Sequence, residues 1–378
     1  MSEFVPFAFA FACVYLTLAF AVFAGNLRFS RAKGHERYPF VSIVLCARNE
    51  EASLQRCLDG LENIDYPSDR MEFILVDDES SDRTKEMLAS FASGTDNTVV
   101  LSTEGLQSSY PGKQHPLDLG IGHARGDFMF MIDADCRVEP VWIRMHLAAY
   151  DDSTGVVAGI TGIEAEGRGL FAKIQNCDQT AKLATARGAA GLGLPLTVMG
   201  NNMSLRREAW EAVGGFEQIG PSIVEDVDLL HAIVRNTRYR MRWTAERRSA
   251  VRSLPFGDFG AFVSQRKRML AVNCGVPAFG MALIGLEIVM TVSVISAAVM
   301  SYLSPVPFLV LFGAWILGNA SVILSAAGPL TKYLPLLPVM FIFQAVYGIA
   351  LGLLALRGGP VLWKGRRYER GAQTSKTR

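Results

Sequence analysis

The chain has 378 residues, and its 37 Lys and Arg side chains nearly balance 36 Asp and Glu, which leaves a formal net charge of +1. This balance gives no indication of a nucleic-acid partner, which would require a basic excess. Half of the residues are hydrophobic, and the mean hydropathy is positive.

Four long apolar stretches account for this hydropathy. They cover residues 4–24, 276–303, 306–327 and 334–356. Each is close to the ~20 residues that a helix needs to cross the hydrocarbon core of a bilayer. Residues 31–268 have an ordinary globular composition. The sequence therefore predicts a membrane enzyme or transporter with a soluble domain inserted after its first span.

The first apolar stretch is either a cleavable signal peptide or a retained anchor. Val22-Phe23-Ala24 loosely resembles a cleavage site, but the preceding residues, MSEF, carry no positively charged side chain. The positive charges follow the stretch instead, at Arg28, Arg31, Lys33 and Arg37. A basic flank after the span favours an anchor whose N-terminus lies outside and whose soluble domain lies in the cytoplasm.

The C-terminal tail is strongly basic. One acid, Glu369, stands among the basic residues Arg357, Lys364, Arg366, Arg367, Arg370, Lys376 and Arg378. The same rule places this tail in the cytoplasm, but three full spans after a cytoplasmic domain would place it outside. We therefore expect one apolar stretch to be re-entrant or interfacial, unless its boundaries differ from those above.

The soluble part alternates between apolar runs and amphipathic segments. Strands are predicted at 40–46, 72–76, 99–101, 128–132 and 156–161, and helices at 50–61, from Ser81 or Asp82 to 91, at 140–150 and at 170–186. Strand–helix alternation is typical of a parallel, doubly wound sheet. The glycine-rich residues 188–193 are expected to form a mobile loop, with a structural turn as the alternative. The six cysteines form no Cys-x-x-Cys pair, which favours a reducing compartment.

The strand predicted at 128–132 ends in two carboxylates. Asp133 and Asp135 stand one residue apart directly after its apolar run. Ligands of α/β proteins bind at the carboxyl ends of strands, and clustered carboxylates suit a hard divalent cation. The sequence thus predicts a binding site at this strand end.

Five motifs carry a resemblance to a known family. They are ARNE (47–50), VDDESSDRT (76–84), GKQHPLDLGIGHARGD (112–127) leading into Asp133-Ala134-Asp135, GNNMSLRREAWEAVGGF (200–216) and VEDVDL (224–229). From about residue 39 to 268 the chain resembles the family-2 glycosyltransferases, among them enzymes that glycosylate lipids, carotenoids or ceramides and polysaccharide synthases. The resemblance implies a GT-A nucleotide-sugar-binding domain with a mostly parallel sheet. One N-terminal and about three C-terminal transmembrane helices complete the expected α/β architecture.

The resemblance implies how a nucleotide-sugar donor is bound. Asp77 or Asp78 would accept a hydrogen bond from a uracil-type N–H, and Ala47, Arg48 and Glu50 would belong to the same donor site. The alternative for Asp78 is a turn-forming role.

A metal ion and a basic residue would complete the donor site. Asp133 would contact the ribose or the metal and Asp135 would bind the metal, Mg²⁺ or Mn²⁺, which acts as a Lewis acid on the leaving diphosphate. Lys113 would lie near the donor, with a solvated surface lysine as the alternative.

The VEDVDL motif supplies the candidate general base, Asp226. The resemblance implies that its carboxylate removes a proton from the acceptor hydroxyl during attack on the anomeric carbon. One base without a second nucleophilic carboxylate implies a single displacement with inversion. The alternative is a carboxylate favoured at a helix start by the dipole. Glu225 is expected to position the reactants, and Asn201 and Asn202 to bind sugar hydroxyls unless they only form a turn.

Gln265 and Arg268 belong to the sequence QRKRM, which resembles the family's Gln-x-x-Arg-Trp motif with Met269 in place of tryptophan. Both are expected to cover the donor diphosphate and the acceptor. The alternative is a basic amphipathic helix at 259–270 on anionic lipid. The missing aromatic ring puts in doubt a role in holding a growing polymer. Glu287, inside an apolar stretch, is expected to face the acceptor's entry path or to contact another helix.

The sequence thus predicts transfer of one sugar, from a UDP-sugar in the first instance, to a lipophilic acceptor at the cell (inner) membrane. The alternatives are a processive polysaccharide synthase and a non-catalytic membrane binder that keeps the fold. The expected domains are an anchor (1–30), a cytoplasmic GT-A domain (31–254), an interfacial segment (255–274), a transmembrane region (275–356) and a basic cytoplasmic tail (357–378).

Overall fold

The computed structural model describes residues 4–29, 38–107, 110, 112–222, 224–244, 251–271, 277–326, 334–357, 361–363 and 366–368, with the backbone alone for 267–271 and from 352 onward. Its elements are α1 (Phe4–Leu27), β1 (Val41–Ala47), α2 (Leu54–Glu62), η1 (Ser68–Arg70), β2 (Met71–Asp77), α3 (Thr84–Gly94), β3 (Thr98–Ser102), α4 (Gln114–His123), β4 (Phe128–Asp133), β5 (Cys136–Val138), α5 (Trp142–Leu147), β6 (Thr154–Ala158), β7 (Thr161–Ile163), α6 (Leu170–Gly191), η2 (Gly200–Asn202), β8 (Met203–Arg206), α7 (Arg207–Ala212), α8 (Gly215–Ile219), α9 (Glu225–Asn236), β9 (Arg240–Trp243), β10 (Val251–Ser253), α10 (Phe259–Ala271), α11 (Ala278–Val299), α12 (Val306–Ala326), α13 (Leu337–Arg357), β11 (Val361–Trp363) and β12 (Arg366–Tyr368).

A seven-stranded sheet forms the centre of the α/β part, in the order β3-β2-β1-β4-β8-β6-β9. The strands β3, β2, β1 and β4 are parallel, whereas β8 runs antiparallel to both of its neighbours. The chain builds from β1 toward β3 and then returns to place β4 on the other side of β1. A topological switch point therefore lies between β1 and β4, and ligands of such sheets bind at this place.

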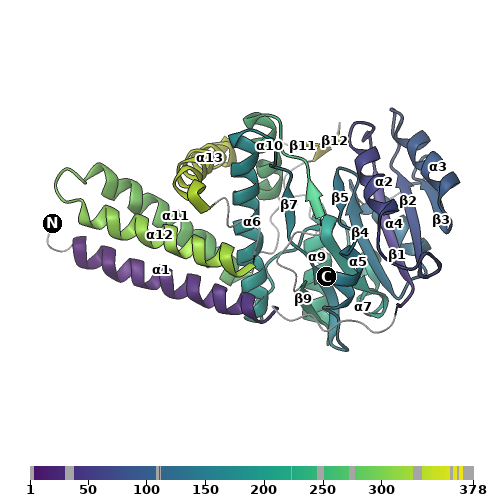
Figure 1. Cartoon of the computed structure of the whole chain (residues 1–378), viewed down its shortest axis with the longest axis horizontal. Helices are drawn as coiled ribbons and strands as arrows, with labels where there is room; N and C mark the ends of the chain where they lie inside the picture. Colours follow the sequence, from purple (N-terminus) through teal and green to yellow (C-terminus); the bar gives the residue numbers. More distant parts are fainter. Residues whose placement is uncertain are drawn as a thin grey trace, which may run out of the picture.

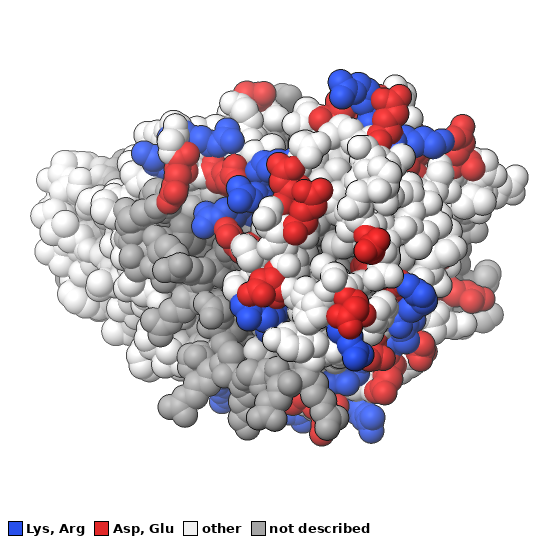
Figure 2. Space-filling view, turned by 45° about the vertical axis from the view of Figure 1, so that its right-hand side comes forward, with Lys and Arg blue, Asp and Glu red and all other residues white. Residues whose placement is uncertain are grey.

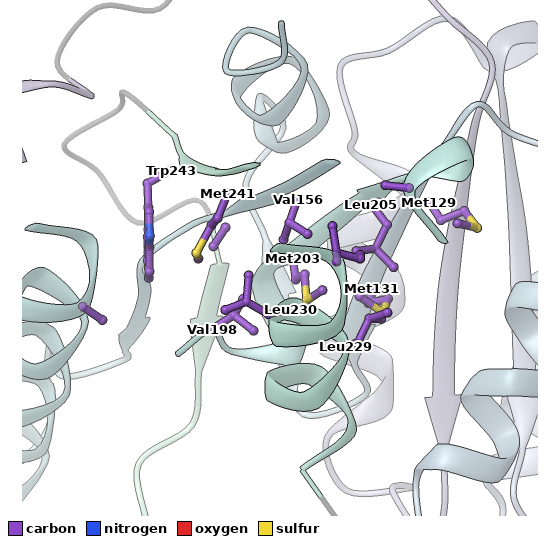
Figure 3. Packing of buried hydrophobic residues seen from close by; sticks show 14 of the residues in the cluster. Met129, Met131, Val156, Val198, Met203, Leu205, Leu229, Leu230, Met241 and Trp243 are labelled. Atoms are coloured by element: carbon purple, nitrogen blue, oxygen red, sulfur yellow. The ribbon is translucent and has the colours of Figure 1, made fainter. Parts of the chain in front are cut away.

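Helices cover both faces of this sheet. On one face, Phe73 and Phe130 pack in a cluster with apolar residues of α2 and α5. On the other face, Met131 and Met203 pack with Leu230 of α9 (Figure 3). Neighbouring residues such as Phe130 and Met131 thus point to opposite faces, and both are buried. This is why the strands have continuous apolar sequences.

The strand predicted at 156–161 is wrong, because the structure has two strands there, β6 and β7. They belong to different sheets, since β7 joins the three-stranded sheet β5-β10-β7. Between them, the Gly159 N–H donates to the Asn202 carbonyl oxygen at 2.9 Å. A Cβ at Gly159 would lie only 2.5 Å from Asn202 Nδ2. The run looks continuous in sequence because both halves are buried.

Among the described residues, four helices are long and apolar enough to cross a membrane: α1, α11, α12 and residues 334–351, which overlap α13. In Figure 1, α1, α11 and α12 run side by side away from the sheet, whereas α13 lies next to α6 and α10. Figure 2 shows charged side chains over the α/β part and none on the described surface of the helices at its left. The basic residues Arg31, Lys33 and Arg37 and the tail after residue 368 lie outside the described residues.

The mobile loop predicted at 188–193 is also wrong, because α6 continues to Gly191 and only the last two residues turn. Gly188 and Gly191 lie against the end of α1. A Cβ at Gly191 would be 2.0 Å from the Gly25 oxygen, and one at Gly188 would be 2.3 Å from the Val22 oxygen. Small residues let two helix backbones approach each other. These glycines therefore mark a helix–helix contact.

Glu287 contacts other helices, as one of its two predicted alternatives requires. Its Oε1 accepts a hydrogen bond from Tyr15 Oη of α1 at 2.7 Å, and its Oε2 accepts one from Trp315 Nε1 of α12 at 3.3 Å. Asn319 Nδ2 donates in turn to Tyr15 Oη at 3.0 Å. One polar layer thus joins α1, α11 and α12 near the middle of each helix.

Candidate active site

Parallel strands bring the predicted donor-binding residues to one edge of the sheet. Ala47 at the end of β1 lies beside Asp77 at the end of β2. Cys46 of β1 lies beside Asp133 at the end of β4. Asp135 follows in the turn between β4 and β5. Residues distant in the sequence therefore meet at the switch point.

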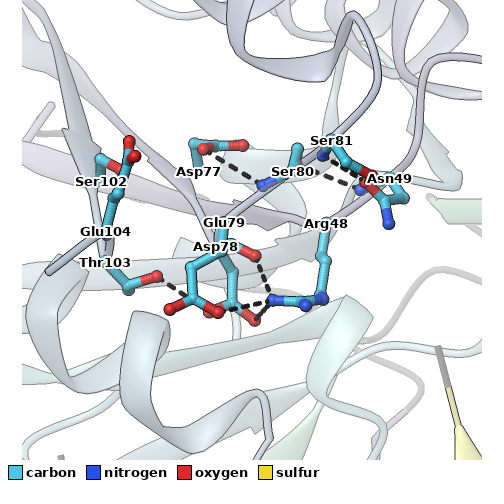
Figure 4. Close-up of polar contacts among 10 residues, drawn as sticks. All are labelled: Arg48, Asn49, Asp77, Asp78, Glu79, Ser80, Ser81, Ser102, Thr103 and Glu104. Carbon is cyan, nitrogen blue, oxygen red and sulfur yellow. Dashed lines mark hydrogen bonds and ion pairs between the residues drawn. The ribbon is translucent and has the colours of Figure 1, made fainter. Parts of the chain in front are cut away.

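The loops after β1 and β2 are joined by side-chain contacts (Figure 4). Arg48 Nη1 donates to the Asp78 carbonyl oxygen at 2.7 Å and pairs with Glu79 at 3.1 Å. Asn49 has a φ of 52°, in the left-handed region that asparagine tolerates. Its Oδ1 accepts a hydrogen bond from the Ser81 N–H at 2.8 Å. These contacts fix the loop that carries Asp78.

Ala47 and Glu50 add backbone contacts to the same arrangement. The Ala47 carbonyl oxygen accepts a hydrogen bond from the Asp78 N–H at 2.8 Å. The Glu50 N–H donates to Thr84 Oγ1 at 2.8 Å, and the Glu50 carboxylate accepts from Ser53 Oγ at 2.7 Å. Direct contact of either residue with a donor remains a prediction.

Asp77 and Asp78 differ in how their carboxylates are occupied. Asp78 Oδ1 accepts a hydrogen bond from Thr103 Oγ1 at 2.9 Å. Asp77 is only 2% exposed, and its Oδ2 accepts from the Ser80 N–H at 3.4 Å. Its Oδ1 has no hydrogen-bond partner among the described residues. A buried acceptor without a partner is costly, and a ligand N–H would remove that cost. Asp77 is therefore the stronger candidate for binding a base.

Lys113 lies beside Asp133. Its ammonium forms an ion pair with Asp133, and its side chain is 19% exposed, unlike the solvated surface lysine of the alternative interpretation. Burial alone would lower the pKa of Lys113, but the carboxylates of Asp133 and Glu225 outweigh burial and raise that pKa. Lys113 therefore keeps its positive charge at the end of β4.

Glu225 and Asp226 open α9 and join the same electrostatic cluster. Asp226 Oδ2 accepts a hydrogen bond from the Gly200 N–H at 2.7 Å, and Oδ1 accepts one from the Val227 N–H at 2.9 Å. Burial raises the pKa of Asp226. Burial, followed by the charge of Asp226, raises the pKa of Glu225 to about 7. Each Asp226 oxygen keeps a second lone pair, so the carboxylate can still accept a proton.

The carboxylates fit a metal ion that binds together with a phosphate ligand. The described residues contain no group of three or more His, Cys, Asp or Glu side chains that could hold a metal. Mg²⁺-type sites commonly combine one or two carboxylates with substrate phosphates. Asp133 already binds a cation, the Lys113 ammonium, and Asp135 Oδ1 accepts a hydrogen bond from the Cys136 thiol at 3.3 Å. Asp133 and Asp135 therefore suit a shared site better than a resident one.

Two residues that shape the site, Arg56 and Gln114, are not among the site residues predicted from the sequence. Arg56 Nη1 of α2 donates to the Asp135 carbonyl oxygen at 3.2 Å, from 79 positions away. Gln114 is fully buried, and its Oε1 accepts from the Ser222 N–H at 2.7 Å, 108 positions away. Gln114 Nε2 also donates to the Gly220 carbonyl oxygen at 2.8 Å. Arg56 thus holds the Asp135 turn, and Gln114 holds the segment before α9.

The two predicted asparagines lie in the interior. Asn201 Oδ1 accepts from Thr161 Oγ1 at 2.8 Å, and its Nδ2 donates to Cys136 Sγ at 3.3 Å. Asn202 is fully buried, and its Oδ1 accepts from Trp142 Nε1 at 3.0 Å. Both side chains thus join distant parts of the interior, and sugar binding by either amide remains a prediction.

The QRKRM segment lies on α10. Gln265 Oε1 is buried without a hydrogen-bond partner among the described residues. Arg266 pairs with Asp178 of α6 at 3.1 Å, whereas the side chain of Arg268 lies outside the described residues. The predicted contact of Gln265 and Arg268 with a diphosphate or an acceptor remains a prediction.

The doubly wound sheet, with acidic side chains at its switch point and apolar helices attached, has the architecture of the GT-A class. The family model for Glycosyl transferase family 2 matches residues 42–214. Residues 42–214 therefore match a glycosyltransferase family 2 domain, and the predicted resemblance is confirmed.

Curated relatives and a solved structure agree with this assignment. A probable glycosyltransferase, YdaM, of Bacillus subtilis is 27% identical over 208 residues, which are 54% of this chain and 49% of that protein. A beta-monoglucosyldiacylglycerol synthase of Trichormus variabilis is 26% identical over 220 residues, 57% and 46% of the two chains. The chain spans about half the length of these relatives.

A mannosyltransferase from Pyrobaculum calidifontis, solved in complex with GDP-Man and Mn²⁺, has a TM-score of 0.55 with 15% identity. The match covers 93% of this chain and 99% of that one. Similarity at this identity shows the fold alone, and it confirms the predicted GT-A architecture.

Proposed function

We propose that this protein transfers one sugar from a nucleotide-diphosphate sugar, such as a UDP-sugar, to a lipophilic acceptor in the membrane, with inversion at the anomeric carbon. One observation carries the proposal. Lys113, Asp133, Glu225 and Asp226 form a single electrostatic cluster at the switch point of a family-2 domain. The part of the chain that the structure describes also has four helices long and apolar enough to cross a membrane.

The donor base would bind at the end of β2. Asp77 Oδ1 is the buried acceptor that lacks a partner among the described residues, and a uracil-type ring N–H would supply one. Arg48 and Asn49 hold the neighbouring loop, so the acceptor is in place before the donor binds. The Lys113 ammonium would pair with the diphosphate, since a charged donor binds phosphate oxygens strongly.

Asp135 and Asp133 would hold Mg²⁺ or Mn²⁺ together with the donor diphosphate. When bound, such an ion neutralises charge on the leaving diphosphate as a Lewis acid. The solved mannosyltransferase, which contains Mn²⁺ and GDP-Man, supports the use of a divalent metal. Arg56 would keep Asp135 in position through its carbonyl oxygen.

Asp226 would act as the general base. Its carboxylate is fixed by the Gly200 and Val227 N–H groups, and burial raises its pKa toward the pH at which it works. A base with a pKa nearer the working pH accepts a proton more effectively. The proton leaves the acceptor hydroxyl as its oxygen attacks the anomeric carbon. Because no second carboxylate attacks the sugar, the step is one displacement.

The acceptor would be a membrane lipid or a similar apolar alcohol. The name of the Trichormus relative, a diacylglycerol-modifying synthase, supports a lipid acceptor. So does the packing of α6 against α1, α12 and α13, which attaches the catalytic domain to the apolar helices. We place the protein in the cell (inner) membrane with the catalytic domain in the cytoplasm, where the basic residues after α1 belong.

Incubation of the purified protein in native-lipid membranes with radiolabelled nucleotide sugars and Mn²⁺, followed by solvent extraction, tests this proposal. We expect label in the organic phase at one sugar per acceptor, and about 10²–10⁴-fold less with the Asp226→Asn variant. Label in an insoluble, high-mass fraction would indicate a polysaccharide synthase instead. Absence of transfer with every donor, despite nucleotide binding, would leave the non-catalytic binder as the better description.

A further inference from the structure

The middle of α13 is fixed to charged residues of the catalytic side. Gln344 Nε2 and Tyr347 Oη both donate to Asp178 Oδ1 of α6, at 2.9 and 3.0 Å. The Asp178 side chain is fully buried and pairs with Lys182 at 2.8 Å and with Arg266 of α10 at 3.1 Å. Charges of this kind are costly at the centre of a bilayer. The middle of α13 therefore lies away from the bilayer centre, at the same depth as α6 and α10 of the catalytic domain.

The beginning of α13 lies near the middle of the three helices α1, α11 and α12. The Phe341 ring is 5.0 Å from the ring of Trp315, which belongs to the polar layer around Glu287. From the bilayer centre to its surface is about 15 Å, half of a ~30 Å core. The 21 residues of α13 extend about 31 Å. A helix of this length that begins near the bilayer centre stays within one leaflet only if it lies strongly tilted to the membrane normal.

The chain beyond α13 lies on the catalytic side. The strand β11 packs against α10 (Figure 1). The loop that enters α10 is joined to α6, because Gln175 Nε2 donates to the Phe256 carbonyl oxygen at 3.0 Å and Gln175 Oε1 accepts from the Phe256 N–H at 2.9 Å. In contrast, the turn between α11 and α12 lies at the end of these helices that is farthest from the sheet.

The outer face of α13 is apolar. Val339, Ile342, Val346 and Ile349 follow the three- and four-residue spacing of one helix face, and they are 38, 64, 54 and 61% exposed. Phe343 and Tyr347 on the inner side pack against Phe262 of α10, with ring centroids 5.3 and 5.5 Å apart. Large apolar side chains are also exposed on α1, α11 and α12. Its chemistry therefore suits lipid acyl chains.

We propose that α13 does not cross the membrane, although it is long and apolar enough to do so, and that it lies in the leaflet on the catalytic side. Its outer stripe, Val339, Ile342, Val346 and Ile349, faces acyl chains, and its inner face holds α6 and α10 at the membrane surface. Only α1, α11 and α12 cross. After the catalytic domain, the two crossings of α11 and α12 return the chain to the catalytic side, which resolves the conflict between the basic tail and a fourth span.

The side of the tail provides the first test. The full chain carries an epitope after Arg378, and matched variants carry it after Asp96, in an exposed turn of the catalytic domain, or after Tyr302, which is 82% exposed in the α11–α12 turn. In sealed vesicles, we expect a protease to reach the epitopes at Arg378 and Asp96 from one side and the epitope at Tyr302 from the other. An Arg378 epitope that behaves like the Tyr302 epitope would overturn the proposal.

Depth in the bilayer provides the second test. Spin labels at Ile342 and Ile349 are compared with labels at Leu309 and Leu317 of α12, which are both 63% exposed. Cys13, an exposed cysteine, is replaced by alanine throughout. The α12 pair should differ in depth by about 12 Å, as eight residues along a spanning helix require, and the α13 pair by a few ångström (about 3–4). A difference near 10 Å in α13 would mean that it crosses. If the α13 labels are inaccessible both to oxygen and to a water-soluble nickel reagent, protein covers the outer face of α13. That result would also contradict the proposal.

Discussion

The protein buries two clusters of charged side chains that are composed in opposite ways. At the edge of the sheet, the three carboxylates of Asp133, Glu225 and Asp226 share one cation, Lys113. Between α6, α10 and α13, one carboxylate, Asp178, binds two cations and two neutral donors. The first cluster has an excess of negative charge, and the second has an excess of positive charge.

The pKa values follow this difference. Burial raises the pKa of Glu225 and of Asp226, and too little positive charge is present to reverse the effect. Burial also acts to raise the pKa of Asp178, but Lys182 and Arg266 outweigh it and lower that pKa. A cluster short of positive charge is suited to receiving a cation or a proton. A cluster with its carboxylate fully paired is suited to joining helices. The two clusters should therefore respond differently to the loss of one carboxylate.

The largest effect is expected for Asp226→Asn. An amide keeps the shape of the side chain but cannot remove a proton, so sugar transfer should fall by about 10²–10⁴-fold, the usual contribution of a general base. Donor binding, measured by nucleotide-sugar titration, should remain. Asp152→Asn, at an exposed position, is the matched control and should leave transfer unchanged. Retained turnover in the Asp226 variant would remove this residue from the role of base.

Asp135→Ala should abolish the metal dependence of donor binding. Removal of a residue that only hydrogen-bonds to a metal ligand weakens metal binding by about 10–100-fold. Removal of a ligand itself should weaken metal binding at least as much. Titration calorimetry with a nucleotide sugar, with and without Mn²⁺, measures the effect. In metal-free buffer the variant and the parent should bind equally weakly. An unchanged response to Mn²⁺ would refute the ligand assignment.

Asp178→Asn should act on stability instead of chemistry. It leaves Lys182 and Arg266 without their shared carboxylate, and breaking such a buried pair costs about 3–5 kcal/mol. Denaturant unfolding in lipid discs measures the change in the free energy of unfolding. The control is Asp65→Asn in the exposed pair with Arg144, which should cost less than about 1 kcal/mol. Equal effects in the two variants would mean that burial does not distinguish these pairs.

The parallel strands β1, β2, β3 and β4 and the acidic residues Asp77 and Asp133 could be predicted because their signals are local. A covered parallel strand is an apolar run, and Asp77 and Asp133 stand directly at the ends of such runs. The family motifs added Lys113 and Asp226, which the structure places in the cluster with Asp133. The positions of β8, β6 and β9 in the sheet, with β8 antiparallel to its neighbours, do not follow from these local signals.

The remaining features depend on partners distant in the sequence. Arg56 contacts the Asp135 turn, and Gln114 contacts the segment before α9. Neither partner can be identified from the residues next to Arg56 or Gln114 in the sequence. Gly188 and Gly191 suggested a loop because the helix that they contact, α1, lies far away in the sequence. The length of α13 satisfied the rule for a span, whereas its contact with Asp178 appears only in the folded chain.

The smallest effect is expected from Glu225→Gln, and it concerns the dependence of stability on pH. The pKa of Glu225 is raised from 4.5 to about 7 in the folded protein, first by burial and then by Asp226. Between these values the folded state binds more protons than the unfolded state, so the contribution of Glu225 to stability is full below pH 4.5 and is lost as the pH rises through about 7. Glutamine does not titrate, and the free energy of unfolding of the variant should therefore fall less over this range. Parallel pH series of denaturant unfolding for the two proteins measure the difference.

Because Asp178 has a lowered pKa, its contribution to stability has the opposite sign and is lost toward acid pH. The Asp178→Asn variant should accordingly flatten the acid side of the profile, and the Glu225 variant the side that approaches neutrality. Identical profiles for the parent and the Glu225 variant would show that this carboxylate is not held in its protonated form.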